Sequence, residues 1–219
     1  MPEEETPRKQ TRAPGERSRA RIVEQAARLA SIEGIEGLSL GRLADATGIA
    51  KSSVYALFGS KEELQLATIN AARDSFIAEV VAPALDATQP GRERLLALCE
   101  GFLSYVERRI FPGGCFFVAV SAEVGARPGR VHDEVARIQQ QWRDLLEHEA
   151  NAAVENGELP PGTDPGQIAF ELGVILAGTN IVSVLHDDQA VVARARSAVK
   201  RRLPASCMPA PDSHGSTRR

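Results

Sequence analysis

Apolar side chains recur every three or four positions along most of this 219-residue chain, and prolines and glycines interrupt the pattern at intervals. That period is typical of amphipathic α-helices, whereas the alternation typical of β-strands is almost absent. The pattern predicts an all-α fold of about nine helices. Pro83 is expected to stop the fourth helix. The first helix ends at Gly34, and the others are expected at residues 40–47, 51–58, 61–81, 92–110, 116–124, 131–156, 165–185 and 188–203.

The two short helices expected within residues 39–58 have the pattern of a helix-turn-helix. Ser39 is a good N-cap for the first, and Gly48 favours the left-handed turn that ends it. The second helix places Val54, Leu57 and Phe58 on one side. Its free side is small and polar and consists of Lys51, Ser52, Ser53, Tyr55 and Ala56. Such a face suits a DNA major groove, where hydroxyl and amino groups read the edges of the bases.

The next helix is predicted to begin with a capping box that runs from Ser60 to Glu63. Lys61 therefore lies in the first turn, where the helix dipole disfavours a cation. A nearby DNA phosphate would explain a lysine at this position, and an ordinary solvated lysine is the alternative.

From about Arg17 to Leu64 the chain resembles the TetR family of bacterial transcriptional repressors. Three residues depart from the family's pattern, namely Gly41, Ala50 and Ser52. Ala50 stands where a capping serine or threonine is usual, so we expect the recognition helix to be less stable by about 1 kcal/mol unless Lys51 or Ser52 takes over the cap. The resemblance rests on the helix end at Gly34 and on Leu38-Ser39, Leu43-Ala44, Gly48-Ile49, Tyr55, Phe58 and Ser60-Lys-Glu-Glu-Leu64.

The resemblance implies a transcriptional regulator with a DNA-binding head at residues 16–60 and a helical ligand-binding and dimerisation domain at residues 61–203. Such a regulator is expected to be a repressor that a small molecule releases from a pseudo-palindromic operator on double-stranded DNA. The segments 1–15 and 204–219 are rich in proline, serine and charge, and we expect them to be disordered. Base contacts are expected from Lys51, Ser52, Ser53 and Tyr55, and phosphate contacts from Arg42 and Lys61.

The charges are distributed unevenly along the chain, although the formal net charge is only −3. Residues 8–61 hold ten basic and five acidic side chains, whereas residues 62–203 hold 14 basic and 20 acidic ones. A basic head on an acidic body confines phosphate binding to the head. An asymmetry that arose by chance is the alternative.

The expected helix at residues 165–185 carries no charge from Leu172 to Leu185 and is apolar on every side. These fourteen residues are too few to span a bilayer, so the helix needs protein on two sides. The resemblance implies a homodimer that forms through the last two helices as a four-helix bundle. A helix buried wholly inside its own subunit is the alternative. The candidate interface residues are Val174, Gly178, Ile181 and Val184.

Six aromatic side chains are distributed over the helices where the family binds its ligand. They suit the lining of an apolar cavity for a small hydrophobic ligand, and they are equally compatible with a packed core. They are Phe76, Phe102, Tyr105, Phe116, Phe117 and Trp142.

The residue groups that would indicate an enzyme are missing from the sequence. The three cysteines have no CxxC spacing, which argues against a disulfide framework and a zinc site. His132 and His148 would lie roughly 160° apart on one helix, so they cannot share a metal. No glycine-rich phosphate loop occurs, and we expect neither a cofactor nor a metal. An enzyme or carrier with a helix-turn-helix head and a ligand-independent DNA-binding protein are the alternative functions.

The chain contains no run of 18 apolar residues, and its N-terminus, Met1-Pro-Glu-Glu-Glu5, has the wrong charge for a secretory signal. The sequence therefore predicts a cytoplasmic protein that does not span a membrane.

Overall fold

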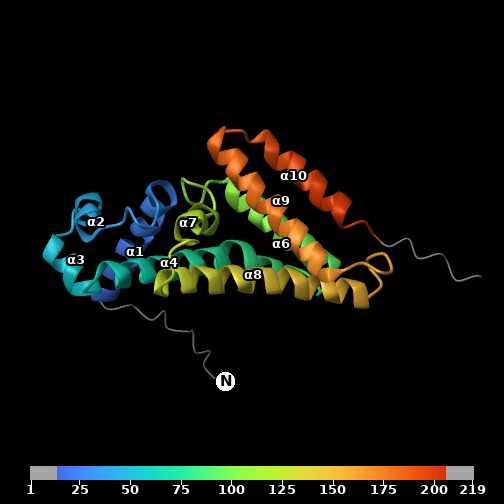
Figure 1. The fold of residues 1–219 in the computed structure, drawn as a ribbon, viewed down its shortest axis with the longest axis horizontal. Coiled ribbons are helices and arrows are strands. Elements are labelled where there is room, and N and C mark those ends of the chain that lie inside the picture. The colour runs from blue at the N-terminus through green and yellow to red at the C-terminus, as the bar shows by residue number, and fades with distance from the viewer. Residues whose placement is uncertain (1–13, 206–219) are drawn as a thin grey trace, which may run out of the picture. The chain divides into compact units, whose positions relative to one another are not determined.

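The computed structural model describes residues 14–205, with side chains from Ser18 onward. All but the last two residues of the predicted arm, and all but the first two of the predicted tail, lie outside the described residues. The described part of the chain is all-helical, as predicted (Figure 1). Its elements are α1 (Pro14–Glu33), α2 (Leu40–Thr47), α3 (Lys51–Phe58), α4 (Lys61–Phe76), the π-helix η1 (Ile77–Val81), α5 (Ala82–Ala87), α6 (Arg92–Glu107), α7 (Phe116–Val124), α8 (Arg130–Glu155), α9 (Pro165–Leu185) and α10 (Ala190–Arg202).

The segments α4, η1 and α5 follow one another in sequence without a break, and this corrects one predicted boundary. Pro83 does not stop the helix, which continues to Ala87. A proline inside an α-helix leaves a carbonyl of the preceding turn without a donor, and its ring crowds that carbonyl. Here the π-helix widens the turn, and the N–H of Ala82 donates to the carbonyl of Ile77, five residues back. Pro83 then lies in the first turn of α5, where a missing N–H is harmless.

The described chain folds into two compact units. The first contains α1 to α3, α4 as far as Asp74, and the segment Phe111–Val135, which includes α7 and the start of α8. The second contains Ser75–Ile110 and the chain from Ala136 onward, which includes η1, α5, α6, most of α8, α9 and α10. The predicted domains at residues 16–60 and 61–203 divide the chain by expected function, and that division stays a prediction.

In the first unit α7 packs against α1. Gly113, just before α7, lies so close to α1 that a Cβ atom there would be 1.7 Å from the carbonyl oxygen of Ser31. The N–H of Gly113 also donates to the hydroxyl of Ser31 at 3.2 Å. Because only glycine permits this approach, the segment before α7 is fixed to the helix that precedes the helix-turn-helix. The fully buried side chains of this unit include Ile22, Leu43, Val54, Leu64, Phe116 and Val120.

In the second unit α6, α9 and α10 lie side by side (Figure 1). The N-terminus of α6 is capped by two carboxylates that follow in the chain. Glu149 of α8 accepts from the N–H of Gly91 at 2.9 Å, and Glu158 accepts from the N–H of Arg92 at 2.8 Å. Carboxylates are favourable at this positive end of a helix. The fully buried side chains of this unit include Leu98, Leu103, Leu146, Leu172 and Val192.

By length and composition α9 could cross a membrane, with a mean hydropathy of 1.9 over its most apolar 18 residues. One face, however, is buried inside its own unit, where Leu172, Leu176 and the polar Ser183 are covered. Such a face fits a helix of a protein bundle better than a span surrounded by lipid. The opposite face excludes the alternative of a helix buried wholly inside its subunit, since it exposes Phe170, Val174, Ile181, Val182 and Leu185.

Candidate functional site

The helix-turn-helix has the geometry that the sequence predicts. The bounds of α2 and α3 are the predicted ones. The side chain of Ser39 accepts from an N–H in the first turn of α2, and Gly48 has a left-handed φ of 68°. Ala50 makes no side-chain capping bond at the start of α3. The recognition helix therefore lacks the stabilisation that a serine or threonine would supply there.

α3 presents one buried and one exposed face. Val54 and Phe58 are buried, and the guanidinium of Arg19 from α1 lies 5.1 Å from the centre of the Phe58 ring. Tyr55 is 55% exposed, so its phenol is available to a base edge or a phosphate. The use of this face in DNA binding stays a prediction for each residue. The exposed face consists of the five residues predicted for it, namely Lys51, Ser52, Ser53, Tyr55 and Ala56.

Only half of the predicted capping box forms at the start of α4. The hydroxyl of Ser60 accepts from the N–H of Glu63 at 3.1 Å, but the N–H of Ser60 donates to the carbonyl of Phe58. The carboxylates of Glu63 and Glu62 pair instead with Arg130 at the start of α8, at 2.7 and 2.9 Å. These hydrogen bonds raise the pKa of Arg130 and fasten the first turn of α4 to α8.

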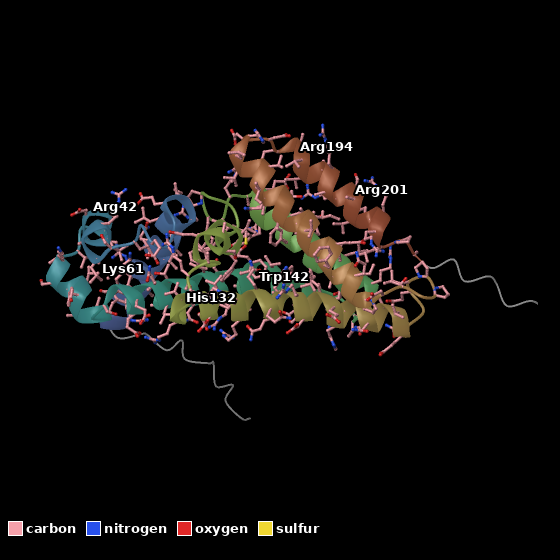
Figure 2. The ribbon with its side chains drawn as sticks, in the orientation of Figure 1. Arg42, Lys61, His132, Trp142, Arg194 and Arg201 are labelled. Carbon is pink, nitrogen blue, oxygen red and sulfur yellow. The ribbon has the colours of Figure 1, made fainter. Side chains whose placement is uncertain are left out.

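Figure 2 labels Arg42 and Lys61, the two cations predicted to reach phosphates. Both are paired with acidic residues of the head. Arg42 donates from Nε and a terminal nitrogen to the two carboxylate oxygens of Glu33, at 3.2 and 2.5 Å. Lys61 donates to the carbonyl of Glu36 at 2.7 Å and to its carboxylate at 3.2 Å. The lysine in the first turn of α4 thus has a partner within the protein, and its contact with phosphate stays a prediction.

The pairs also affect the two acids. The hydrogen bond from Arg42 holds the pKa of Glu33 below its usual value. Burial raises the pKa of Glu36, but the hydrogen bonds from Lys61 and Gln65 and the charges of Lys61 and Arg127 together outweigh that effect and leave the pKa lowered. Both carboxylates are therefore ionised at neutral pH.

Side chains of α7 and α4 form hydrogen bonds with the turn between α1 and α2. Glu123 of α7 accepts from the N–H groups of Ile35 and Glu36 at 2.7 and 3.0 Å. Gln65 of α4 donates to the carbonyl of Ile35 at 2.9 Å and to the carboxylate of Glu36 at 3.2 Å. Glu123 and Gln65 have partners 29 to 88 positions away, so no local sequence pattern indicates these contacts. Glu33 is nine positions from Arg42, and its role depends on how the turn between them folds.

Four of the six predicted ligand residues form one aromatic cluster in the second unit. Phe76 packs edge-on against Phe102, Tyr105 and Trp142, with ring centres 6.1, 5.7 and 5.1 Å apart. Phe102 stacks on Trp142 at 6.3 Å. Phe76, Phe102 and Tyr105 are buried. Trp142 is half-buried, so it forms the outer edge of the cluster.

The other two, Phe116 and Phe117, belong to the first unit. Their ring centres are 5.3 Å apart, and Phe111 lies 6.1 Å from Phe116. All three are buried. The six side chains thus form two packed groups in two units, and a role in ligand binding stays a prediction for each.

The cysteines within the described residues do not suit nucleophilic chemistry. Burial raises the pKa of Cys99 to about 12 and that of Cys115 to about 11. Both thiols are therefore protonated at neutral pH, and a thiolate is the form that attacks substrates. Cys207 lies outside the described residues.

Three of the four predicted dimer residues lie on the free face of α9. Val174 and Ile181 are 55% and 53% exposed, and the space beside Gly178 is open. Val184 is half-buried at the edge of this face. The interface itself stays a prediction. The exposed residues of α10 include Ala190, Ala193, Arg194, Ser197 and Arg201. Figure 2 labels Arg194 and Arg201 among them.

Solved structures of other proteins have the same fold. The TetR transcriptional regulator from Chloroflexus aurantiacus superimposes with a TM-score of 0.78 at 24% identity, over 85% of this chain and 94% of that one. AibR, solved in complex with isovaleryl coenzyme A and operator DNA, gives a TM-score of 0.67 at 25% identity, over 85% of this chain and 99% of AibR.

Proteins related in sequence are also transcriptional regulators. The transcriptional activator FasR of Mycolicibacterium smegmatis is 30% identical over 100 residues, which are 46% of this chain and 45% of FasR, so the match spans less than half of that relative. The family model "Bacterial regulatory proteins, tetR family" matches residues 22–68, and "Tetracyclin repressor-like, C-terminal domain" matches residues 91–199. The chain therefore belongs to the TetR family, and its helix-turn-helix is the head of a DNA-binding transcriptional regulator.

Proposed function

We propose that this protein is a homodimeric repressor that a small ligand releases from a pseudo-palindromic operator. The observation that carries the proposal is the exposed polar face of α3, which is held in place by a buried apolar face and the Gly48 turn. Such a helix fits the major groove. A regulator of this kind acts on DNA in the cytoplasm. FasR is an activator by name, and a transcription assay with and without this protein distinguishes repression from activation.

The contacts follow from the chemistry of the exposed side chains. We assign base-edge contacts to Lys51, Ser52, Ser53 and Tyr55, since amino and hydroxyl groups donate to and accept from base edges. We assign phosphate contacts to Arg42 and Lys61. Arg42 lies in the first turn of α2, which precedes the recognition helix, and Lys61 is the first residue of α4, which follows it.

The proposed homodimer uses the free face of α9. Phe170, Val174, Ile181 and Leu185 are spaced by four and seven residues, so they form one stripe along a helix. An apolar stripe of this length is unusual on a monomer and typical of an interface. A twofold pair of heads then reads two half-sites of an operator.

The proposed ligand is an acyl thioester of the kind bound by AibR, which has the same fold at 25% identity. Its apolar chain would pack against the cluster of Phe76, Phe102, Tyr105 and Trp142, or against Phe116 and Phe117. A ligand-independent DNA-binding protein is the second candidate, because both aromatic groups are already packed.

A mobility-shift experiment on the DNA upstream of the protein's own gene tests the function. Binding in the nanomolar range is expected there, with random DNA at least 1,000-fold weaker, as is typical of specific regulators. Short-chain acyl coenzyme A is expected to release the complex. Equal affinity for the upstream and random DNA would contradict a specific regulator. Failure of every thioester to release the complex would contradict the proposed ligand class and favour the ligand-independent candidate.

Trp142 offers a direct measure of ligand binding, since it is the chain's only tryptophan. We expect a ligand that releases DNA to change the emission of Trp142, because the indole stacks on Phe102 and lies edge-on to Phe76. A Phe116→Trp variant reports on the second cluster. An inducer that alters neither signal would bind elsewhere in the protein.

A further inference from the structure

The cations expected to bind DNA phosphates already hold anions of the head. Arg42 commits two of its nitrogens to Glu33, and Lys61 makes two bonds to Glu36. The paired side chains are 33 to 52% exposed, so a phosphate from solvent can reach both cations. An approaching phosphate would meet a carboxylate at each of them.

One residue of each pair carries a charge that is unfavourable for its own helix. Glu33 is the last residue of α1, at the negative end of the helix dipole, where an anion is unfavourable. Lys61 is the first residue of α4, where a cation is unfavourable for the same reason. The helices would be more stable with the opposite charges, so the pairs are not explained by helix stability alone.

The turn that carries Glu36 is also fixed in position. Glu123 binds the N–H groups of Ile35 and Glu36, and Gln65 binds the carbonyl of Ile35. The carboxylate of Glu36 is therefore held beside Lys61 and does not swing freely in solvent. Glu33 lies just before this turn and makes a two-point contact with Arg42.

We propose that Glu33 and Glu36 compete with DNA phosphates for Arg42 and Lys61, so that the head binds all DNA more weakly than its cations allow. On binding, each cation would exchange a carboxylate for a phosphate, and the released carboxylate would recover a counterion. The pairs thus set the affinity of the regulator low enough for a ligand to release it. This inference rests on the proposed function, since it assumes that the head binds DNA.

The test measures binding to a random-sequence DNA duplex of about 30 base pairs by fluorescence anisotropy at several salt concentrations, with the full chain. Glu33→Gln and Glu36→Gln are the variants. Glu24→Gln is the matched control, because Glu24 is an exposed acid of α1 that makes no ion pair within residues 18–205. Each test variant is expected to bind about two- to five-fold more tightly than the control, which is the range of exposed ion pairs. The salt dependence should steepen by up to about one ion.

Arg42→Ala provides a second check, because in that background Glu33→Gln should change binding no more than Glu24→Gln does. Glu33→Ala with a thermal melt guards against an effect of the glutamine itself. Binding equal to the control would overturn the competition, and weaker binding would show that the acids position the cations. Wild-type protein that binds no DNA would overturn the proposed function as well, whereas normal binding without a difference among the variants would overturn this inference alone.

Discussion

Replacing Val174 or Ile181 by arginine is expected to give folded, helical monomers that no longer bind a full operator. Both side chains are more than half exposed in the single chain, so a charge there leaves the subunit's own core intact. The same charge is buried if the face meets a second copy, and an unpaired buried charge is strongly destabilising. Sedimentation measures whether the variant is a monomer, and circular dichroism measures whether it keeps its helices.

The loss of operator binding should be large. A monomer contacts one half-site, so roughly half of the contact free energy is lost, and a nanomolar site falls toward non-specific strength. Leu176→Arg is the contrasting variant, because Leu176 is 1% exposed and faces the core. It should unfold the subunit instead of separating the dimer. Val184→Arg should also destabilise the subunit, since Val184 is half-buried.

One result would contradict both the interface and the twofold reading of DNA. The unmodified protein would have to be monomeric at micromolar concentration while it binds a full operator tightly. A dimer that survives both Val174→Arg and Ile181→Arg would contradict the interface alone, and the apolar stripe of α9 would then need another occupant.

The sequence predicted those parts of the fold whose signals are local. The bounds of α2 and α3 agree with the prediction because a capping residue, a glycine and an apolar period all lie within a few positions of the helix ends. The exposed face of α3 was predicted for the same reason. On α9 three of the four named interface residues lie on the free face, but the sequence could not separate that face from the core face, because every side of the helix is apolar and only packing distinguishes them.

Features that depend on distant partners were not predicted. The helix continues through Pro83 because η1 adopts a wider turn, and that turn packs on α6 at Gly101, where a Cβ atom would lie 3.2 Å from the carbonyl oxygen of Val80. The half-formed capping box has a similar cause, since Glu63 pairs with Arg130, 67 positions later. Local patterns contain no information on either contact.

In the candidate site, too, single residues were predicted from local patterns, whereas their contacts were not. Arg42 and Lys61 were identified from their positions, but Glu33 and Glu36 were not, because the pairing depends on how the turn between α1 and α2 folds back. The aromatic residues were identified by type alone. Their separation into a cluster around Phe76 and another around Phe116 follows from the packing of the units, which the composition does not specify.

Replacing Lys51 and Tyr55 together by alanine is expected to abolish specific binding while the protein stays folded. Both side chains are exposed on α3, so their loss leaves the buried face of the helix unchanged. Each base contact contributes about 1–3 kcal/mol of discrimination, and the loss of two should weaken operator binding by roughly 30-fold or more.

The pattern of losses separates base contacts from phosphate contacts. The double variant should bind the operator much more weakly and random DNA only slightly more weakly, so that the ratio of the two affinities falls. Arg42→Ala or Lys61→Ala should weaken both by about the same factor and flatten the salt dependence by at most about one ion, because Glu33 and Glu36 already offset part of each charge. Arg143→Ala, at an exposed arginine of α8, is the control and should change neither. Operator binding that is unchanged by Lys51→Ala and Tyr55→Ala at low salt would show that α3 does not read the DNA through this face.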